Sequence, residues 1–84
     1  MNIEQLEKLI DIPTIIESTE YEGAYLGCKT FTWEKGEFDK VKARVLKWRE
    51  NLYNNVNVLD YSVDTGVPYL AQIDVTFKLN EKIK

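Results

Sequence analysis

The longest apolar pattern in the chain is a helical repeat that runs from Gly36 to Asn55. Asp39 falls in its first turn, where a carboxylate suits the helix dipole, and the pair Asn54–Asn55 is typical of a helix end. The pattern predicts an amphipathic helix over residues 37–54 that carries most of the core-forming bulk. At 100° per residue, five apolar side chains share one stripe of this helix: Phe38, Val41, Val45, Trp48 and Leu52.

A shorter helical pattern lies near the start of the sequence. Asn2 suits an N-cap, and Gln5 stands three residues later, as in a capping box. Pro13 ends the pattern, so we expect a short helix over residues 3–11 that is stable only when docked on the rest of the chain. Its apolar stripe consists of Ile3, Leu6, Leu9 and Ile10.

The remaining regions have the β-branched and aromatic residues typical of strands. Residues 24–33 predict one strand, and residues 14–19 predict a shorter hairpin partner for it. Residues 69–79 alternate most regularly, and a polar tail follows over residues 80–84. The faces expected to be apolar hold Tyr25, Phe31 and Trp33 with Gly27 and Lys29 in the first strand, Leu59, Tyr61 and Val63 in residues 56–63, and Tyr69, Ala71, Ile73, Val75, Phe77 and Leu79 in the last strand.

The order of these elements predicts a single α+β domain over residues 1–84, built as a two-layer sandwich. It consists of a short N-terminal helix, a strand or hairpin, the long amphipathic helix and a C-terminal β-hairpin. A strand, a crossover helix and a parallel strand are followed by an antiparallel strand, which predicts a small mixed sheet. We expect the most apolar strand, residues 69–79, in its middle and both helices on one face.

Charge is distributed unevenly along this acidic sequence, which has a net charge of −3. Residues 1–34 hold seven acidic and two basic side chains, whereas residues 35–50 hold six basic and three acidic ones. The acidic front and the basic helix are either two parts of one binding surface or a solvated exterior whose charges partly cancel.

The sequence favours an intracellular, cytoplasmic protein. It has a single cysteine, Cys28, so no disulfide can form within the chain. No apolar run is long enough to span a bilayer, and the first residues lack the basic and apolar regions of a signal peptide.

Catalytic chemistry is poorly supported, because the sequence contains no histidine. Catalytic triads and zinc sites that use histidine are therefore excluded. We expect that the protein is not an enzyme and that it binds no cofactor and no metal. Cys28 is interpreted as a semi-buried structural thiol. Asp64-Thr65-Gly66 matches the short signature of aspartic proteases, but we interpret it as a hairpin turn in which Gly66 supplies a positive φ.

The basic face of the long helix is the candidate interaction surface. Lys40, Arg44 and Lys47 form one exposed ridge at helical spacing, opposite the apolar stripe, and Lys42 and Arg49 lie together at the other border of that stripe. Two apolar side chains beyond that border either touch the N-terminal helix or join an interface patch: Leu46 and Tyr53.

Three functions fit these features. The first is a small non-enzymatic protein-binding module, an inhibitor or adaptor of the type common in phages and mobile elements. The second is a nucleic-acid-binding protein that uses the ridge of Lys40, Arg44 and Lys47 on phosphates. The third is a small self-assembling structural subunit, a homo-oligomer that pairs through a sheet edge or its open face. A protein partner ranks above nucleic acid, because a polyanion is repelled by the fourteen acidic residues.

Overall fold

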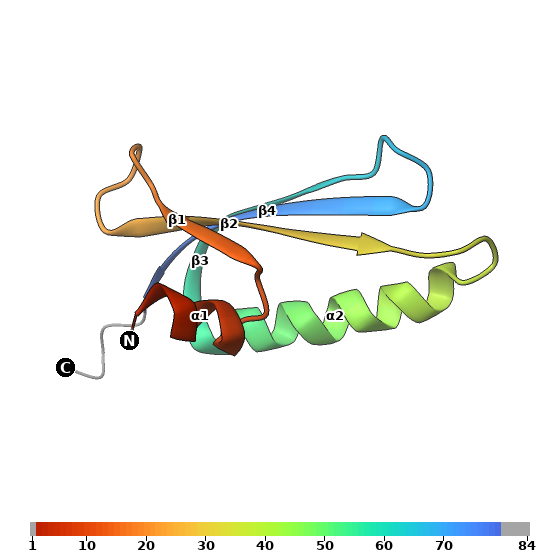
Figure 1. Cartoon of the computed structure of the whole chain (residues 1–84), viewed down its shortest axis with the longest axis horizontal. Coiled ribbons are helices and arrows are strands. Elements are labelled where there is room, and N and C mark those ends of the chain that lie inside the picture. The colour runs from red at the N-terminus through yellow and green to blue at the C-terminus, as the bar shows by residue number, and fades with distance from the viewer. Residues whose placement is uncertain (1, 80–84) are drawn as a thin grey trace.

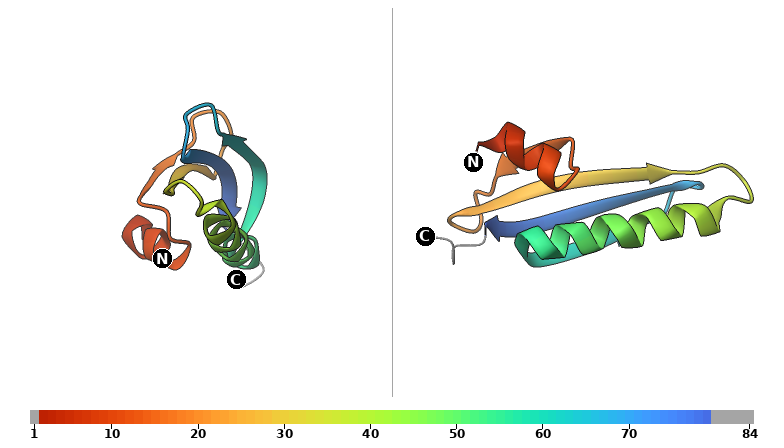
Figure 2. Two further views of the ribbon diagram at one scale, coloured as in Figure 1. Left: turned by 90° about the vertical axis from the view of Figure 1, so that its right-hand side faces the viewer. Right: turned by 90° about the horizontal axis from the view of Figure 1, so that it is seen from below.

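The structure, a computed structural model, describes residues 2–79, so the predicted polar tail over 80–84 lies outside the described residues. Four strands form one sheet in the order β1-β2-β4-β3. Both helices lie on the same face of this sheet, as Figures 1 and 2 show from three directions. In chain order the elements are α1 (Ile3–Leu9), β1 (Thr14–Glu17), β2 (Ala24–Thr32), α2 (Phe38–Asn55), β3 (Val56–Asp64) and β4 (Leu70–Leu79).

The predicted two-layer α+β sandwich is confirmed, with one correction to the sheet. Every neighbouring pair of strands is antiparallel, so the sheet is not mixed. β2 and β3 do run parallel to each other, as the crossover through α2 requires. However, β4 lies between them and pairs antiparallel with both, because the closing hairpin folds the most apolar strand into the interior of the sheet.

Both elements predicted before β2 form. The capping box of α1 is complete, with Asn2 Oδ1 accepting the Gln5 N–H at 2.8 Å and Gln5 Oε1 accepting the Asn2 N–H at 3.1 Å. The helix ends earlier than predicted, because Asp11 adopts a left-handed backbone with φ 52°. Residues 14–17 of the predicted hairpin partner form β1, which pairs with the first half of β2.

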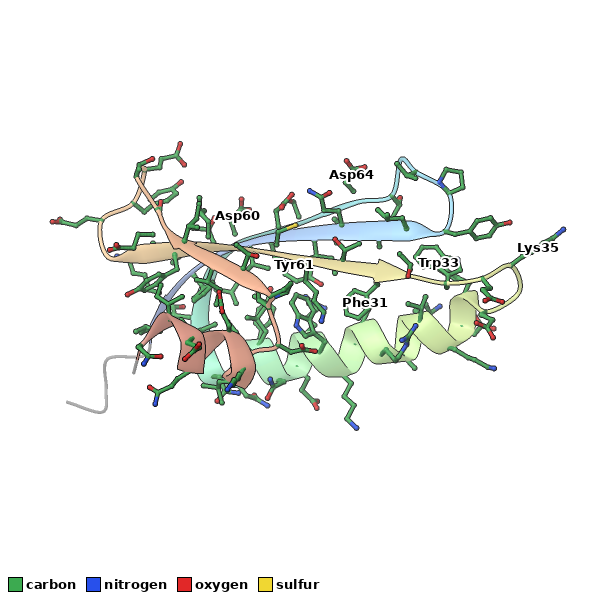
Figure 3. The ribbon with its side chains drawn as sticks, in the orientation of Figure 1. Phe31, Trp33, Lys35, Asp60, Tyr61 and Asp64 are labelled. Carbon is green, nitrogen blue, oxygen red and sulfur yellow. The ribbon has the colours of Figure 1, made fainter. Side chains whose placement is uncertain are left out.

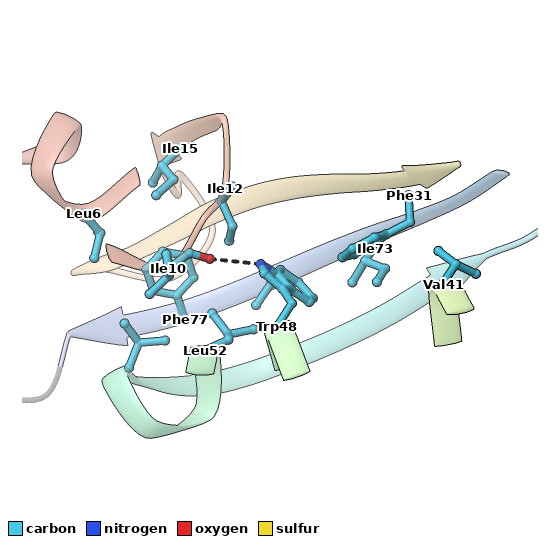
Figure 4. Close-up of a cluster of buried hydrophobic side chains, with 12 residues drawn as sticks. Leu6, Ile10, Ile12, Ile15, Phe31, Val41, Trp48, Leu52, Ile73 and Phe77 are labelled. Atoms are coloured by element: carbon cyan, nitrogen blue, oxygen red, sulfur yellow. Dashed lines mark hydrogen bonds between the residues drawn. The ribbon is translucent and has the colours of Figure 1, made fainter. Parts of the chain in front are cut away.

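The core lies between the sheet and the two helices, with Trp48 of α2 near its centre (Figure 4). Its indole ring meets the edge of Phe31 at a centroid distance of 5.7 Å. Its Nε1–H donates to the carbonyl oxygens of Ile10 and Asp11 at 2.9 and 3.1 Å, which joins α2 to the segment that follows α1. The other buried members of the cluster are Leu6, Ile12, Ile15, Val41, Leu52, Val56, Ile73, Val75 and Phe77.

Two aromatic residues predicted on apolar faces are largely exposed. Phe38, the first residue of α2, is 53% exposed, and Tyr69, which precedes β4, is 48% exposed. Both pack edge-on against Trp33, at 5.6 and 6.5 Å between ring centroids. They lie where α2 and β4 begin, and Tyr69 has a φ of 61°, so it does not continue the alternation of the strand.

β3 contains a bulge that the alternating pattern does not predict. Val58 pairs with Phe77 and Asp60 pairs with Thr76, so Leu59 is the extra residue. Leu59 is 44% exposed, and its predicted place on the apolar face of the sheet is wrong. The bulge lets both Val58 and Tyr61 pack against the core cluster, although they are three residues apart.

The junction of α2 and β3 also differs from the prediction. The helix continues to Asn55 and passes directly into an extended Val56, with φ −139° and ψ 165°. Neither Asn54 nor Asn55 adopts the left-handed conformation expected of a helix end. Instead, the Asn55 side-chain amide donates to the Asn51 carbonyl oxygen at 2.7 Å.

Candidate functional site

A groove of about 520 Å³ lies between the outer edge of β2 and the side of α2. Phe31 extends from β2 toward α2 and forms part of its floor (Figure 3). The complete lining is Asp11, Lys29, Thr30, Phe31, Thr32, Arg44, Lys47, Trp48 and Asn51.

The groove exists because β1 covers only the first half of β2. The last pair of the β1–β2 ladder joins Thr14 to Cys28. Before Thr14 the chain turns beneath the sheet, where buried Ile12 packs on Gly27. A Cβ on Gly27 would lie only 3.0 Å from Ile12 Cγ2, so glycine permits this close approach. Among residues 2–79, no strand pairs with the outer edge of β2 over residues 29–32.

Two threonines direct their backbone polar groups at this uncovered edge. The Trp33 N–H donates to the Tyr69 carbonyl oxygen at 3.2 Å on the β4 side, whereas the Ala24 carbonyl oxygen accepts the Ser18 N–H at 2.9 Å on the β1 side. Backbone groups alternate in direction along a strand, and the β2–β4 register is continuous. The N–H and C=O groups of Thr30 and Thr32 therefore point away from β4, toward the groove side.

The charges around the groove differ in sign from those of the whole chain. Three cationic side chains and one carboxylate line it, in a protein with a net charge of −3. Lys29 Nζ lies 3.1 Å from Asp11 Oδ2 and 5.4 Å from the centre of the Phe31 ring. Arg44 and Lys47 are exposed on α2, so they are the cations available to an incoming anion.

The structure divides the predicted basic ridge. Arg44 and Lys47 line the groove, but Lys40 does not, and its Nζ lies 3.6 Å from Glu37 Oε2 at a largely exposed site. The ridge therefore flanks the core stripe near the groove rather than forming one separate basic surface.

The other predicted interaction residues lie on the opposite side of α2. Lys42 Nζ stands 5.9 Å from the Phe38 ring centre, and the Arg49 guanidinium lies over two tyrosine rings, those of Tyr53 and Tyr61, at 5.1 and 5.2 Å. Contact of Leu46 and Tyr53 with α1 is excluded, because α1 meets the groove side of α2, where Asn51 Nδ2 donates to the Leu9 carbonyl oxygen at 2.9 Å. Instead, a shallow depression of about 200 Å³ is lined by Leu46, Arg49, Glu50 and Tyr53.

Sequence reasoning missed the contribution of β2 to the site. A signal was present in Lys29, a charged residue that alternates with apolar ones on the face predicted to meet the helices. A charged side chain at such a position must either pair with an opposite charge or extend to the solvent-exposed border of the core. Lys29 does both, because it pairs with Asp11 and lines the groove. The open edge itself carries no sequence signal, because it depends on where β1 begins.

Cys28 fits the structural role predicted for it. It is half-buried on the sheet face away from the helices, beside Asp74. Burial raises the pKa of its thiol, and a hydrogen bond with Asp74 and the negative charge of that carboxylate raise the pKa further. The thiol is therefore protonated at neutral pH and is a poor nucleophile.

Asp64 also behaves as a turn residue. Its Oδ1 accepts the Gly66 N–H at 2.9 Å, which is the hydrogen bond of an Asx-turn. The positive φ predicted for Gly66 is wrong. Glycine suits the position for a steric reason instead, because a Cβ there would lie 3.3 Å from Asp64 Oδ1.

Within residues 2–79, no three acidic, cysteine or histidine side chains are grouped so that they could hold a metal ion. Neither helix in that range combines the length and the apolar character needed to cross a membrane.

Comparison of the chain with protein-family models, with curated proteins and with solved structures found no match in any of the three.

Proposed function

We propose that this protein is a non-enzymatic protein-binding module of the inhibitor or adaptor type. Its groove between β2 and α2 would receive an acidic segment of a partner protein. One observation carries the proposal: Arg44 and Lys47 stand exposed beside the aromatic pair Phe31 and Trp48, at the rim of a groove whose charge is opposite to that of the chain.

This combination suits protein recognition better than phosphate binding. Arginine is enriched in protein interfaces, and complementary charge speeds association and selects the partner. A nucleic-acid surface needs several cations along a phosphate path, but here Lys40 is near Glu37 and Lys29 is paired with Asp11. Only two cations of the groove lack an ion pair among the described residues, which favours a short acidic peptide.

Selection from a displayed library of short random peptides tests this function directly. We expect acidic peptides to be enriched on the native protein and to lose binding to the variant Arg44→Glu/Lys47→Glu. The matched control is Lys35→Glu/Lys42→Glu, which lowers the net charge equally but changes no residue that lines the groove. If the control loses binding equally, recognition depends on overall charge, and the groove is not the binding site.

Titration with a labelled DNA or RNA duplex at about 150 mM salt, where the Debye length is about 8 Å, tests the main alternative. We expect no measurable binding. Sub-micromolar binding that disappears in the variant Lys40→Glu/Arg44→Glu/Lys47→Glu would overturn the proposal in favour of a nucleic-acid-binding protein.

A further inference from the structure

We infer that the partner segment binds by strand addition: it extends along the outer edge of β2 beside Thr30 and Thr32, and its acidic side chains enter the groove. This inference rests on the proposed function, because it specifies how the acidic segment is held. In strand addition, main-chain hydrogen bonds provide affinity and side-chain pockets provide specificity.

On each of the other two exposed edges, a carboxylate caps one outward backbone N–H. On β1, the N–H of Ile15 donates to Glu7 Oε2 at 3.1 Å. On β3, the N–H of Tyr61 donates to Asp60 Oδ1 at 3.0 Å. Among residues 2–79, no side chain or backbone group caps the outward N–H of Thr30 or of Thr32. An extended peptide would satisfy both donors and both carbonyl oxygens.

The alternation of side chains along a strand determines which positions of the bound peptide contact the groove. Lys29 and Phe31 face α2, whereas Thr30 and Thr32 face the open side of the sheet. An added strand alternates in the same way, so every second residue of the peptide would point toward α2. The acidic residues of the peptide are therefore expected at positions i and i+2.

The ends of the groove restrict the length and the charge pattern of the peptide. β1 already occupies the edge as far as Cys28, so about four residues of β2 are available, Lys29 to Thr32. Asp11 lines the groove at the β1 end, where its Oδ2 lies 3.1 Å from Lys29 Nζ, and it would repel a carboxylate there. Because α2 runs back along β2, Arg44 lies toward the Thr32 end, where the strongest preference for an acidic residue is expected.

Amide hydrogen exchange, measured with a selected acidic peptide, tests this mode of binding. At a peptide concentration of about 100 times Kd, exchange at Thr30 and Thr32 should slow by about 100-fold. The amides of Leu26 and Cys28 serve as controls, since they already face β1 within the ladder and should change little. A peptide series with one backbone N-methyl group at each successive position should lose affinity at every second position only.

The outcomes separate the mode of binding from the function. If binding requires Arg44 and Lys47 but the exchange of Thr30 and Thr32 is unchanged, strand addition is wrong and the proposed function stands. If no acidic peptide binds, or if binding survives in the variant Arg44→Glu/Lys47→Glu, the proposed function and strand addition are both wrong. If Thr30 and Thr32 are protected without peptide and light scattering gives twice the monomer mass, the edge is occupied by a second copy, which also overturns the inference.

Discussion

The outer edge of β3 and the uncovered part of β2 belong to the same sheet but meet solvent in different ways. β3 is interrupted by the bulge at Leu59, and the next outward amide, that of Tyr61, is capped by Asp60. β2 has an unbroken register with β4, and its outward amides at Thr30 and Thr32 have no cap among residues 2–79.

This difference matters because an exposed strand edge is a template for pairing with another chain. Natural proteins disrupt such edges with bulges, charges or covering segments. Here a bulge and a carboxylate protect β3, and the carboxylate of Glu7 caps β1. Among residues 2–79, the uncovered part of β2 has neither a bulge nor a capped outward amide, and it adjoins a groove with cationic side chains. This coincidence favours a binding edge.

Replacement of Trp48 should have the largest effect, because its ring packs against Phe31 of β2 and against Tyr61 of β3. Trp48→Ala removes the ring that supports Phe31 and the donor that holds Ile10 and Asp11, just before the chain passes beneath β2. We expect a loss of about 3–5 kcal/mol in the free energy of unfolding. Urea denaturation followed by far-UV circular dichroism measures it.

Trp48→Phe is the matched control for that experiment. It keeps an aromatic ring but removes the Nε1–H, so it should cost less than Trp48→Ala, about 1–3 kcal/mol for the carbonyl groups left without their donor. If Trp48→Ala unfolds at nearly the same urea concentration as the native protein, Trp48 is not at the centre of the core.

Removal of the cap on β1 should have the next largest effect. Glu7→Ala leaves the part-buried N–H of Ile15 without its acceptor, and hydrogen bonds to charged groups contribute about 1.5–3 kcal/mol. Glu7→Gln keeps an acceptor oxygen and should recover part of that loss. Equal stability of Glu7→Ala and the native protein would show that capping this edge contributes nothing to folding.

The architecture was predictable because it follows from repeating patterns. The stripe of α2 and the alternation of β4 specify buried faces, and Val41, Trp48, Leu52, Ile73 and Phe77 are all buried as predicted. These residues indicate which face of each element is covered, and the order of the elements then indicates which one lies inside the sheet.

The candidate site was less predictable, because it depends on where individual strands begin, end or bulge, and the repeating patterns do not specify these points. β1 begins only at Thr14 because the preceding Ile12 packs beneath the sheet on Gly27, and this contact brings together residues distant in sequence. Leu59 was misplaced for a related reason, since a bulge changes which residues face the core without changing their composition. Of the predicted interaction residues, Arg44 and Lys47 reach the groove, but Lys29, Thr30 and Thr32 complete it.

Deletion of Leu59 should make the edge of β3 resemble that of β2. The residues on either side of Leu59 already pair with consecutive residues of β4, Phe77 and Thr76, so the deletion restores an uninterrupted ladder. We expect a change of less than about 1 kcal/mol in stability, since an exposed side chain is removed. We also expect self-association that light scattering detects as mass increasing with concentration. A deletion variant that stays monomeric would mean that the bulge does not protect this edge.

The smallest effect is expected at the turn that joins β3 to β4. Asp64→Asn keeps the Oδ1 acceptor for the Gly66 N–H, so the Asx-turn survives and stability should change by less than about 0.5 kcal/mol in thermal unfolding. Asp64→Ala removes the acceptor and should cost more, about 0.5–1.5 kcal/mol. The same pair of variants tests the protease-like sequence Asp64-Thr65-Gly66, because a catalytic aspartate does not tolerate asparagine, whereas a turn residue does. Peptide binding that is lost in a folded Asp64→Asn protein would therefore contradict the turn interpretation and would move the proposed binding site from the edge of β2 to the end of β3.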